Sequence, residues 1–252
     1  MKTSYDEIRR MCFQALDAAG AAAGIDEDSA HAAAWLEAVG MPGLKTLADA
    51  LDGSDTPARS GGLVPSSAAA HEMTVPADGR SCAFFAPSLV DLMIGIASRS
   101  GARPVSLRLE NAAHPLYLIA TAVRFCPADA RLLLTWETDD GRTEVETTRN
   151  LVTRLSPDID AHHWQTARPA GTVEMVYRPA DDGGRAGRSD NGSSFLLHKS
   201  AVGDRLATAL RDGLDVDDEA HARVAAYAAR ILVPETETSR ISGAGAGLTD
   251  ND

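Results

Sequence analysis

The sequence is poor in aromatic residues, lysine and cysteine. Aromatic residues make up 5% of the 252 positions, and 21 of the 24 basic residues are arginine. The core must therefore be built mainly from leucine, valine, isoleucine and alanine. Cys12, Cys82 and Cys126 are few and widely spaced, which disfavours a disulfide framework or a cysteine metal site. We expect buried thiols in a reducing cytoplasm.

Long hydrophobic runs and basic clusters are also missing. No stretch approaches the roughly 18 uncharged apolar residues of a membrane span, and the first residues lack the apolar region of a secretory signal. The net charge is −12. An acidic surface repels phosphate backbones and anionic lipid. We therefore expect a cytoplasmic protein with neither nucleic acid nor a membrane as partner.

Hydrophobic spacing divides the chain into three parts. Residues 1–52 predict a helical N-terminal unit, and residues 53–70, rich in Gly, Ser, Pro and Asp, predict a linker or long surface loop. Residues 71–252 predict a domain with a central, mainly antiparallel sheet, two C-terminal helices and a Gly-rich tail over 235–252. The fold class is therefore α+β, and the polar stretch 180–194 is expected to be a mobile loop.

Several elements have specific local signals. Ser4 is placed to cap a first helix, and alternating residues over 103–109 predict a half-buried strand. Strands over 131–137 and 142–148 form the clearest hairpin, because Asp140-Gly141 lies in the turn between them. The segment 116–125 is read as a helix, although its β-branched residues leave a strand open.

The best cluster of polar residues is Glu110, Asn111 and His114. It lies where a strand ends and a helix begins, which is where α/β-type folds place ligands. Glutamate, asparagine and histidine can supply a base, an orienting amide and an acid. In the alternative interpretation, which we favour, Asn111 only caps the following helix. No histidine has a metal-binding spacing, so we predict no metal site, and no motif identifies a cofactor.

The chain ends in the unusual sequence SRISGAGAGLTDND. A dinucleotide-binding loop needs a strand before its glycines and a helix after them, and neither can form here. We instead expect the tail to pack back on the domain. Arg240 could pair with a carboxylate, and Gly243, Gly245 and Gly247 would permit close approach, so these four residues are candidate ligand contacts.

Both ends of the chain resemble a bacterial family known only as a domain of unknown function. The shared features are the N-terminal helices, EIRRMCFQALDAAGAAAGIDEDSAHAAAWLEAVGMPGL, and the C-terminal Ser-Arg, Gly-Ala-Gly-Ala-Gly and Asp-Asn-Asp signature. This resemblance implies no established activity.

The N-terminal helices also resemble the opening of the malate/L-lactate dehydrogenase family. There an alanine-rich helix ends in a Ser-His-Gly turn that contributes to the active site, and this chain has Met41-Pro42-Gly43 at that place. Because the histidine is missing, the resemblance implies a helical docking or dimerisation unit and does not carry dehydrogenase activity over.

Two functions remain open from the sequence. The first is a protein of bacterial metabolism, either an enzyme or a binder of a small molecule, with its site near Glu110, Asn111 and His114. The second is a non-catalytic subunit or assembly partner of a metabolic enzyme, or a homodimer. The absence of a recognisable catalytic motif supports the second reading, and whether the chain is an enzyme stays undecided.

The charge distribution gives a first testable prediction. DNA or RNA should cause no mobility shift with micromolar protein at physiological salt, because a net charge of −12 without a basic stripe offers phosphates no attraction. A shift that weakens as salt is raised would contradict this prediction.

Overall fold

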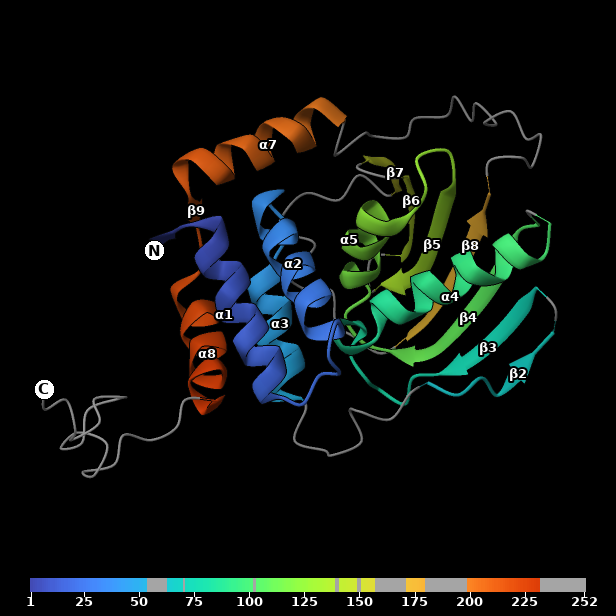
Figure 1. Cartoon of the computed structure of the whole chain (residues 1–252), viewed down its shortest axis with the longest axis horizontal. Helices are drawn as coiled ribbons and strands as arrows, with labels where there is room; N and C mark the ends of the chain where they lie inside the picture. The colour runs from blue at the N-terminus through green and yellow to red at the C-terminus, as the bar shows by residue number, and fades with distance from the viewer. Residues whose placement is uncertain are drawn as a thin grey trace, which may run out of the picture.

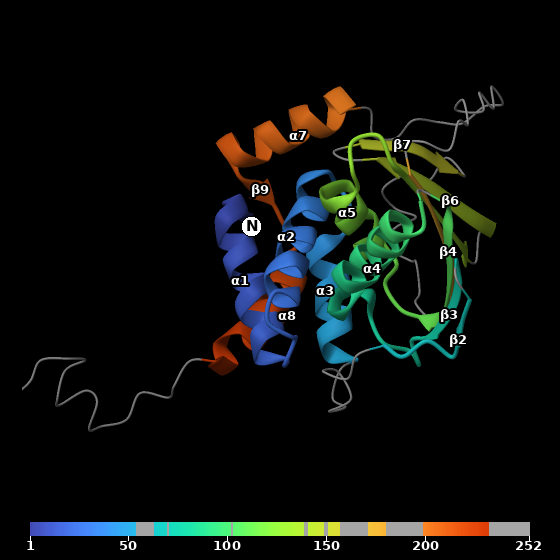
Figure 2. The same cartoon turned by 45° about the vertical axis from the view of Figure 1, so that its right-hand side comes forward.

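The computed structural model describes residues 1–53, 63–69, 71–101, 103–138, 141–148, 151–156, 171–179 and 199–231. Helices at both ends of the chain gather on one side, and a sheet forms the other side (Figure 1). Helices α4 (Ala86–Arg99) and α5 (Leu116–Phe125) lie between them, and a second view shows the same layering (Figure 2). The predicted α+β class is confirmed.

The helical group contains α1 (Tyr5–Ala18), α2 (Ile25–Ala38), α3 (Gly43–Asp52) and α8 (Asp218–Ala228). The predicted cap at Ser4 is confirmed: its hydroxyl accepts from the Glu7 amide at 3.2 Å, and the Glu7 carboxylate accepts from the Ser4 amide at 3.0 Å. Helix α1 buries one face, which includes Ile8 and Leu16.

The C-terminal part of the chain returns to the N-terminal helices. Helix α8 packs against α1 and α3, and β1 (Lys2–Thr3) pairs antiparallel with β9 (Leu214–Asp215). Helix α7 (Lys199–Asp212) contacts α2 and strand β7 (Leu151–Ser156) (Figure 1). The proposed boundaries at residues 52 and 70 stay predictions, while the helical layer combines both ends of the chain. The stretch 180–194 and the tail 235–252 lie outside the described residues.

Within the described residues the main sheet has seven strands in the order β2-β3-β4-β8-β5-β6-β7. Only β3 and β4 pair in parallel, with α4 between them in the chain, and the other pairs are antiparallel. The bounds are β2 (Ser67–Ala68), β3 (Glu72–Pro76), β4 (Val105–Ala112), β5 (Arg131–Thr138), β6 (Gly141–Thr148), β7 (Leu151–Ser156) and β8 (Gly171–Arg178). The described residues also form two short 3₁₀ turns, η2 (Cys82–Phe84) and η3 (Ala229–Ile231).

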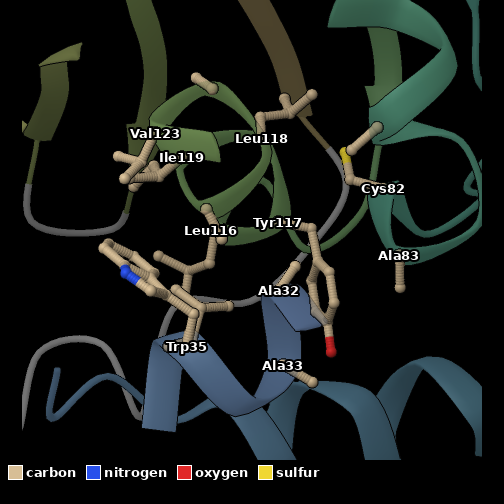
Figure 3. Packing of buried hydrophobic residues seen from close by; sticks show 14 of the residues in the cluster. Ala32, Ala33, Trp35, Cys82, Ala83, Leu116, Tyr117, Leu118, Ile119 and Val123 are labelled. Carbon is tan, nitrogen blue, oxygen red and sulfur yellow. The ribbon is translucent and has the colours of Figure 1, made fainter. Parts of the chain in front are cut away.

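The interface between α2 and α5 joins the helical layer to the rest. Ala32 and Ala33 of α2 face Tyr117 of α5 in Figure 3, with Trp35 beside Leu116. The tyrosine ring is fully buried, and its hydroxyl donates to the Gly43 carbonyl at 3.4 Å. The small alanine side chains let the two helices approach closely, so this interface fixes the start of α3 relative to α5.

Gly43, the first residue of α3, lies against the end of α2. A Cβ atom at Gly43 would lie 2.1 Å from the Ala33 carbonyl oxygen and 3.0 Å from the Glu37 nitrogen. Both are backbone atoms, which cannot turn away as a flexible side chain can. Any larger residue must therefore separate α2 from α3.

This close contact predicts a large effect of a single methyl group. Gly43→Ala should lower the free energy of unfolding by about 1–3 kcal/mol or more, the usual result of overpacking. Urea denaturation measures the change. Gly53→Ala is the matched control, because the added Cβ would lie 3.4 Å from the nearest carbonyl, an ordinary contact. Equal stability of the two variants would contradict the packing argument.

Candidate functional site

The candidate site lies where the parallel strands β3 and β4 end. Beyond the strands the two chains stay bonded: the Ala77 amide donates to the Glu110 carbonyl at 2.8 Å, and the Gly79 amide donates to the Asn111 carbonyl at 2.7 Å. The Ala113 carbonyl then accepts from the Cys82 amide at 2.8 Å. These bonds hold two loops side by side at the carboxyl ends of parallel strands, a frequent position for ligands.

The same two loops hold backbone strain. Asp78, Asn111 and His114 have φ angles of 53°, 53° and 58°, and they are the non-glycine residues with positive φ in the described part of the chain. This left-handed conformation is uncommon for residues other than glycine, although Asn, Asp and His adopt it more readily than the rest. Strain of this kind gathers at functional sites, where the surrounding structure maintains it.

His114 is the histidine on which these contacts centre. It is half-buried, and its Nδ1 atom lies 2.9 Å from the Ser81 hydroxyl oxygen. Burial lowers the pKa of His114, while the Asp49 carboxylate acts in the opposite direction. The burial effect is the larger, so the imidazole is neutral at pH 7.

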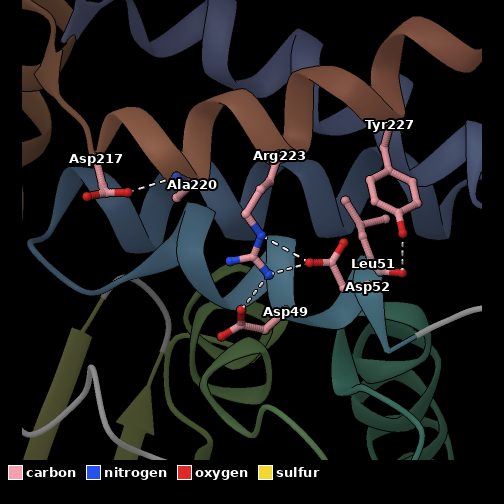
Figure 4. A network of polar contacts seen from close by, with 7 residues as sticks. All are labelled: Asp49, Leu51, Asp52, Asp217, Ala220, Arg223 and Tyr227. Atoms are coloured by element: carbon pink, nitrogen blue, oxygen red, sulfur yellow. Dashed lines mark hydrogen bonds and ion pairs between the residues drawn. The ribbon is translucent and has the colours of Figure 1, made fainter.

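Asp49 reaches this region from α3, and α8 holds it in place. Arg223 of α8 donates to Asp49 at 2.8 Å and, through two of its nitrogens, to Asp52 (Figure 4). Tyr227 donates its hydroxyl to the Leu51 carbonyl at 2.9 Å. Helices α3 and α8 are thus joined at the carboxylate that acts on His114.

The three residues singled out in the sequence have different surroundings. Glu110 is exposed and lies 3.5 Å from the Arg108 guanidinium, with which it forms an ion pair. Asn111 is the next-to-last residue of β4, and the nitrogen of its exposed side chain would lie 4.0 Å from a Cβ atom added at Gly79 in the neighbouring loop. His114 is bonded to Ser81. Ser81 is therefore the hydrogen-bond partner of His114 and the Asp49 carboxylate acts on its pKa, whereas Glu110 is engaged with Arg108.

The interpretation of Asn111 as a helix cap is wrong. Helix α5 begins at Leu116 after Pro115 and has no side-chain cap. Asn111 remains part of β4, and its left-handed backbone turns the chain five residues before the helix starts. The tail candidates Arg240, Gly243, Gly245 and Gly247 lie outside the described residues.

A hollow lies between the starts of α3 and α8. Its volume is about 460 Å³, and Met41, Pro42, Lys45 and Arg223 are among its lining residues. The half-buried Glu37 carboxylate, which also lines it, accepts from the Leu44 amide at 2.9 Å. Burial raises the pKa of Glu37, and the amides of Leu44 and Gly43 oppose this rise. The first turn of α3 is thus capped by the chain's own carboxylate.

Thiol and metal chemistry receive no support from the described residues. Cys12, Cys82 and Cys126 are buried and unpaired, as expected, and burial raises the pKa of each, to about 12 for Cys126. No group of three or more His, Cys, Asp or Glu side chains in the described ranges is placed to hold a metal ion. None of the described helices is long and apolar enough to cross a membrane.

Solved structures with the same fold are dehydrogenases and a reductase. Malate dehydrogenase from Pyrococcus horikoshii OT3 has a TM-score of 0.64 at 9% identity, over 94% of this chain and 97% of that one. A dehydrogenase from Sinorhizobium meliloti has a TM-score of 0.61 at 13% identity, over 90% and 99%. Delta1-piperideine-2-carboxylate reductase from Pseudomonas syringae pvar. tomato has a TM-score of 0.58 at 12% identity, again over 90% and 99%.

The TM-scores show a shared fold, in agreement with the dehydrogenase resemblance of the N-terminal helices. Residues 3–82 match the model of a family described as a protein of unknown function, DUF3726. The match covers the N-terminal helices and the first loop of the candidate site. A comparison with curated proteins finds no match.

The opposing influences on His114 can be separated by experiment. The pKa of His114 should lie below the ordinary value of about 6.5, and Asp49→Asn should lower it further by removing the charge that favours the protonated ring. NMR titration of the imidazole carbon-bound protons measures both values. Asp52→Asn is the control, because Asp52 also binds Arg223 yet does not act on His114. A rise in the pKa in Asp49→Asn would contradict this electrostatic account.

Proposed function

We propose that this chain is a cytoplasmic metabolic protein that binds a small carboxylic acid at the ends of β3 and β4. The observation that carries the proposal is the gathering of three strained residues, Asp78, Asn111 and His114, in two loops that are bonded to each other. Native structures maintain such strain chiefly where a ligand or a reaction requires it.

The chemistry of the loops suits a ligand rich in oxygen. A neutral imidazole and a side-chain amide can each donate a hydrogen bond to a carboxylate, a carbonyl or a hydroxyl group. Two of the proteins with the same fold are named for small carboxylic acids, malate and piperideine-2-carboxylate. Malate is therefore the first probe, with other hydroxy acids, amino acids and nucleotides beside it.

A second function is supported by the turn before α3. Met41-Pro42-Gly43 stands where the resembling dehydrogenases have Ser-His-Gly, and the Glu37 carboxylate caps the helix that follows. A chain that keeps this fold without that histidine could serve as a non-catalytic subunit of a metabolic enzyme, or as a homodimer. Gel filtration alone and with the products of neighbouring genes distinguishes this role, since a stable complex is expected only for a subunit.

Asn111→Gly separates binding from stability. Glycine adopts positive φ freely, so the variant without ligand should melt at the parent's temperature or above it. Its free energy of unfolding should rise by up to ~1 kcal/mol. The same variant should lose the rise in melting temperature that malate or another acid of the screen gives the parent. For the parent, a ligand at about 100 times Kd adds about 2.7 kcal/mol.

Asp78→Gly is the matched control for this prediction. It relieves the same backbone conformation in the neighbouring loop without removing a proposed ligand contact, so ligand-dependent stabilisation should persist. If Asn111→Gly keeps the full ligand-dependent shift, Asn111 is not a ligand contact. If no compound of the screen stabilises the parent, the proposed binding of a small carboxylic acid fails.

A further inference from the structure

We propose that Ser81 is a positioning residue that fixes the His114 ring with its proton on Nε2 and thereby directs an N–H donor at an oxygen atom of the ligand. The part that concerns the ligand rests on the proposed function. The part that concerns the proton rests on the geometry of Ser81 and His114 alone.

The hydroxyl of Ser81 has two hydrogen-bonding neighbours. Its oxygen accepts from the Ala83 amide at 3.2 Å, which caps the turn η2, and it lies 2.9 Å from Nδ1 of His114. Only 6% of Ser81 is exposed. A buried hydroxyl proton needs an acceptor, because a buried donor without a partner costs the free energy of removing it from water. Among the described residues Nδ1 is the acceptor within reach, so the hydroxyl donates to it.

This bond decides the state of the ring. A neutral imidazole carries one proton, and the nitrogen that accepts a hydrogen bond cannot hold it. If Nδ1 accepts from Ser81, Nε2 carries the proton. Among the described residues, this half-buried ring forms its hydrogen bond with Ser81, through Nδ1. The Nε2 atom is therefore left for a ligand. An N–H group at this position binds a carboxylate, carbonyl or hydroxyl oxygen.

The backbone holds the two residues together. Ser81 and Ala113 form an isolated parallel bridge, the Ala113 amide donates to the Arg80 carbonyl at 3.0 Å, and the Cys82 amide donates to the Ala113 carbonyl at 2.8 Å. His114 follows directly, with its φ of 58°. Ser81 therefore stands at a fixed distance from the ring, and free rotation of the imidazole would break a buried hydrogen bond.

The experiment is NMR of the full chain labelled with ¹⁵N-histidine, at about pH 8, where histidine rings are neutral. Long-range proton–nitrogen correlations show which ring nitrogen is protonated, and His114→Gln identifies the His114 signals. We expect Nε2 to be fully protonated in the parent and in Ser81→Thr, which keeps the hydroxyl. Ser81→Ala should give a mixture of the two ring forms. It should also raise the pKa of His114, since the lost bond favoured the neutral ring.

Binding gives a second measurement. Ser81→Ala should weaken the affinity for malate, or for another acid of the screen that binds, about three- to tenfold, the effect of one hydrogen bond. Ser81→Thr should restore it. A role of Ser81 in capping η2 alone would change stability but neither the ring form nor the pKa.

Two results would overturn the role of Ser81. One is a His114 ring that is protonated at Nδ1 in the parent. This measurement needs no variant, so it decides the question even if Ser81→Ala fails to fold. The other is a Ser81→Ala protein with unchanged ring form and pKa. If instead the parent binds none of the acids, the proposed function fails, while the NMR result still decides what Ser81 does to His114.

Discussion

The close approach of α2 to its neighbours is the constraint on which the rest of the structure depends. Alanines on α2 let α5 pack directly on its backbone, and Gly43 lets α3 begin against the end of the same helix. Tyr117 bridges the two contacts by donating to the Gly43 carbonyl. Because α5 follows His114 and α3 contains Asp49, the spacing of these helices also determines how near Asp49 comes to His114.

The electrostatics of the candidate site follow from that spacing. A carboxylate near an imidazole ordinarily favours the protonated ring, yet burial dominates here and lowers the pKa of His114. Arg223 helps to explain the balance, since its guanidinium lies 2.8 Å from Asp49 and offsets much of that negative charge. The Asp49 carboxylate consequently raises the pKa of His114 by less than burial lowers it. The neutral ring that results can donate one hydrogen bond and accept another.

Local signals in the sequence predicted much of the fold. The cap at Ser4, the hairpin of β5 and β6, and the helix over 116–125 depend on residues near one another in the chain, and all three were predicted. Strand β7 was not predicted, because its alternation is short and extends the hairpin without a strong turn signal. The parallel pairing of β3 with β4 also escaped prediction, since the choice of a strand's partner depends on the packing of α4 between them.

The sequence predicted only those residues of the candidate site that lie near one another in the chain. His114 and Asn111 stand out at the end of a strand, but nothing near them in the sequence points to Ser81 or Asp49. Both reach His114 through the fold: Ser81 through the parallel pairing of two loops, and Asp49 through α3. The capping rule misplaced Asn111 because it assumes that the helix follows at once, whereas Pro115 precedes the first helical residue.

The turn before α3 shows how a fold and a chemistry can separate. Only the last residue of Met41-Pro42-Gly43 agrees with the Ser-His-Gly turn of the resembling dehydrogenases, and the structure gives the reason. A side chain at Gly43 would collide with the Ala33 carbonyl, so the glycine belongs to the packing of α2 on α3. Met41 and Pro42 line the hollow beside α8 and are free of that restriction. The glycine of this turn is therefore explained by the packing of α2 on α3, whereas the two residues before it face the hollow beside α8.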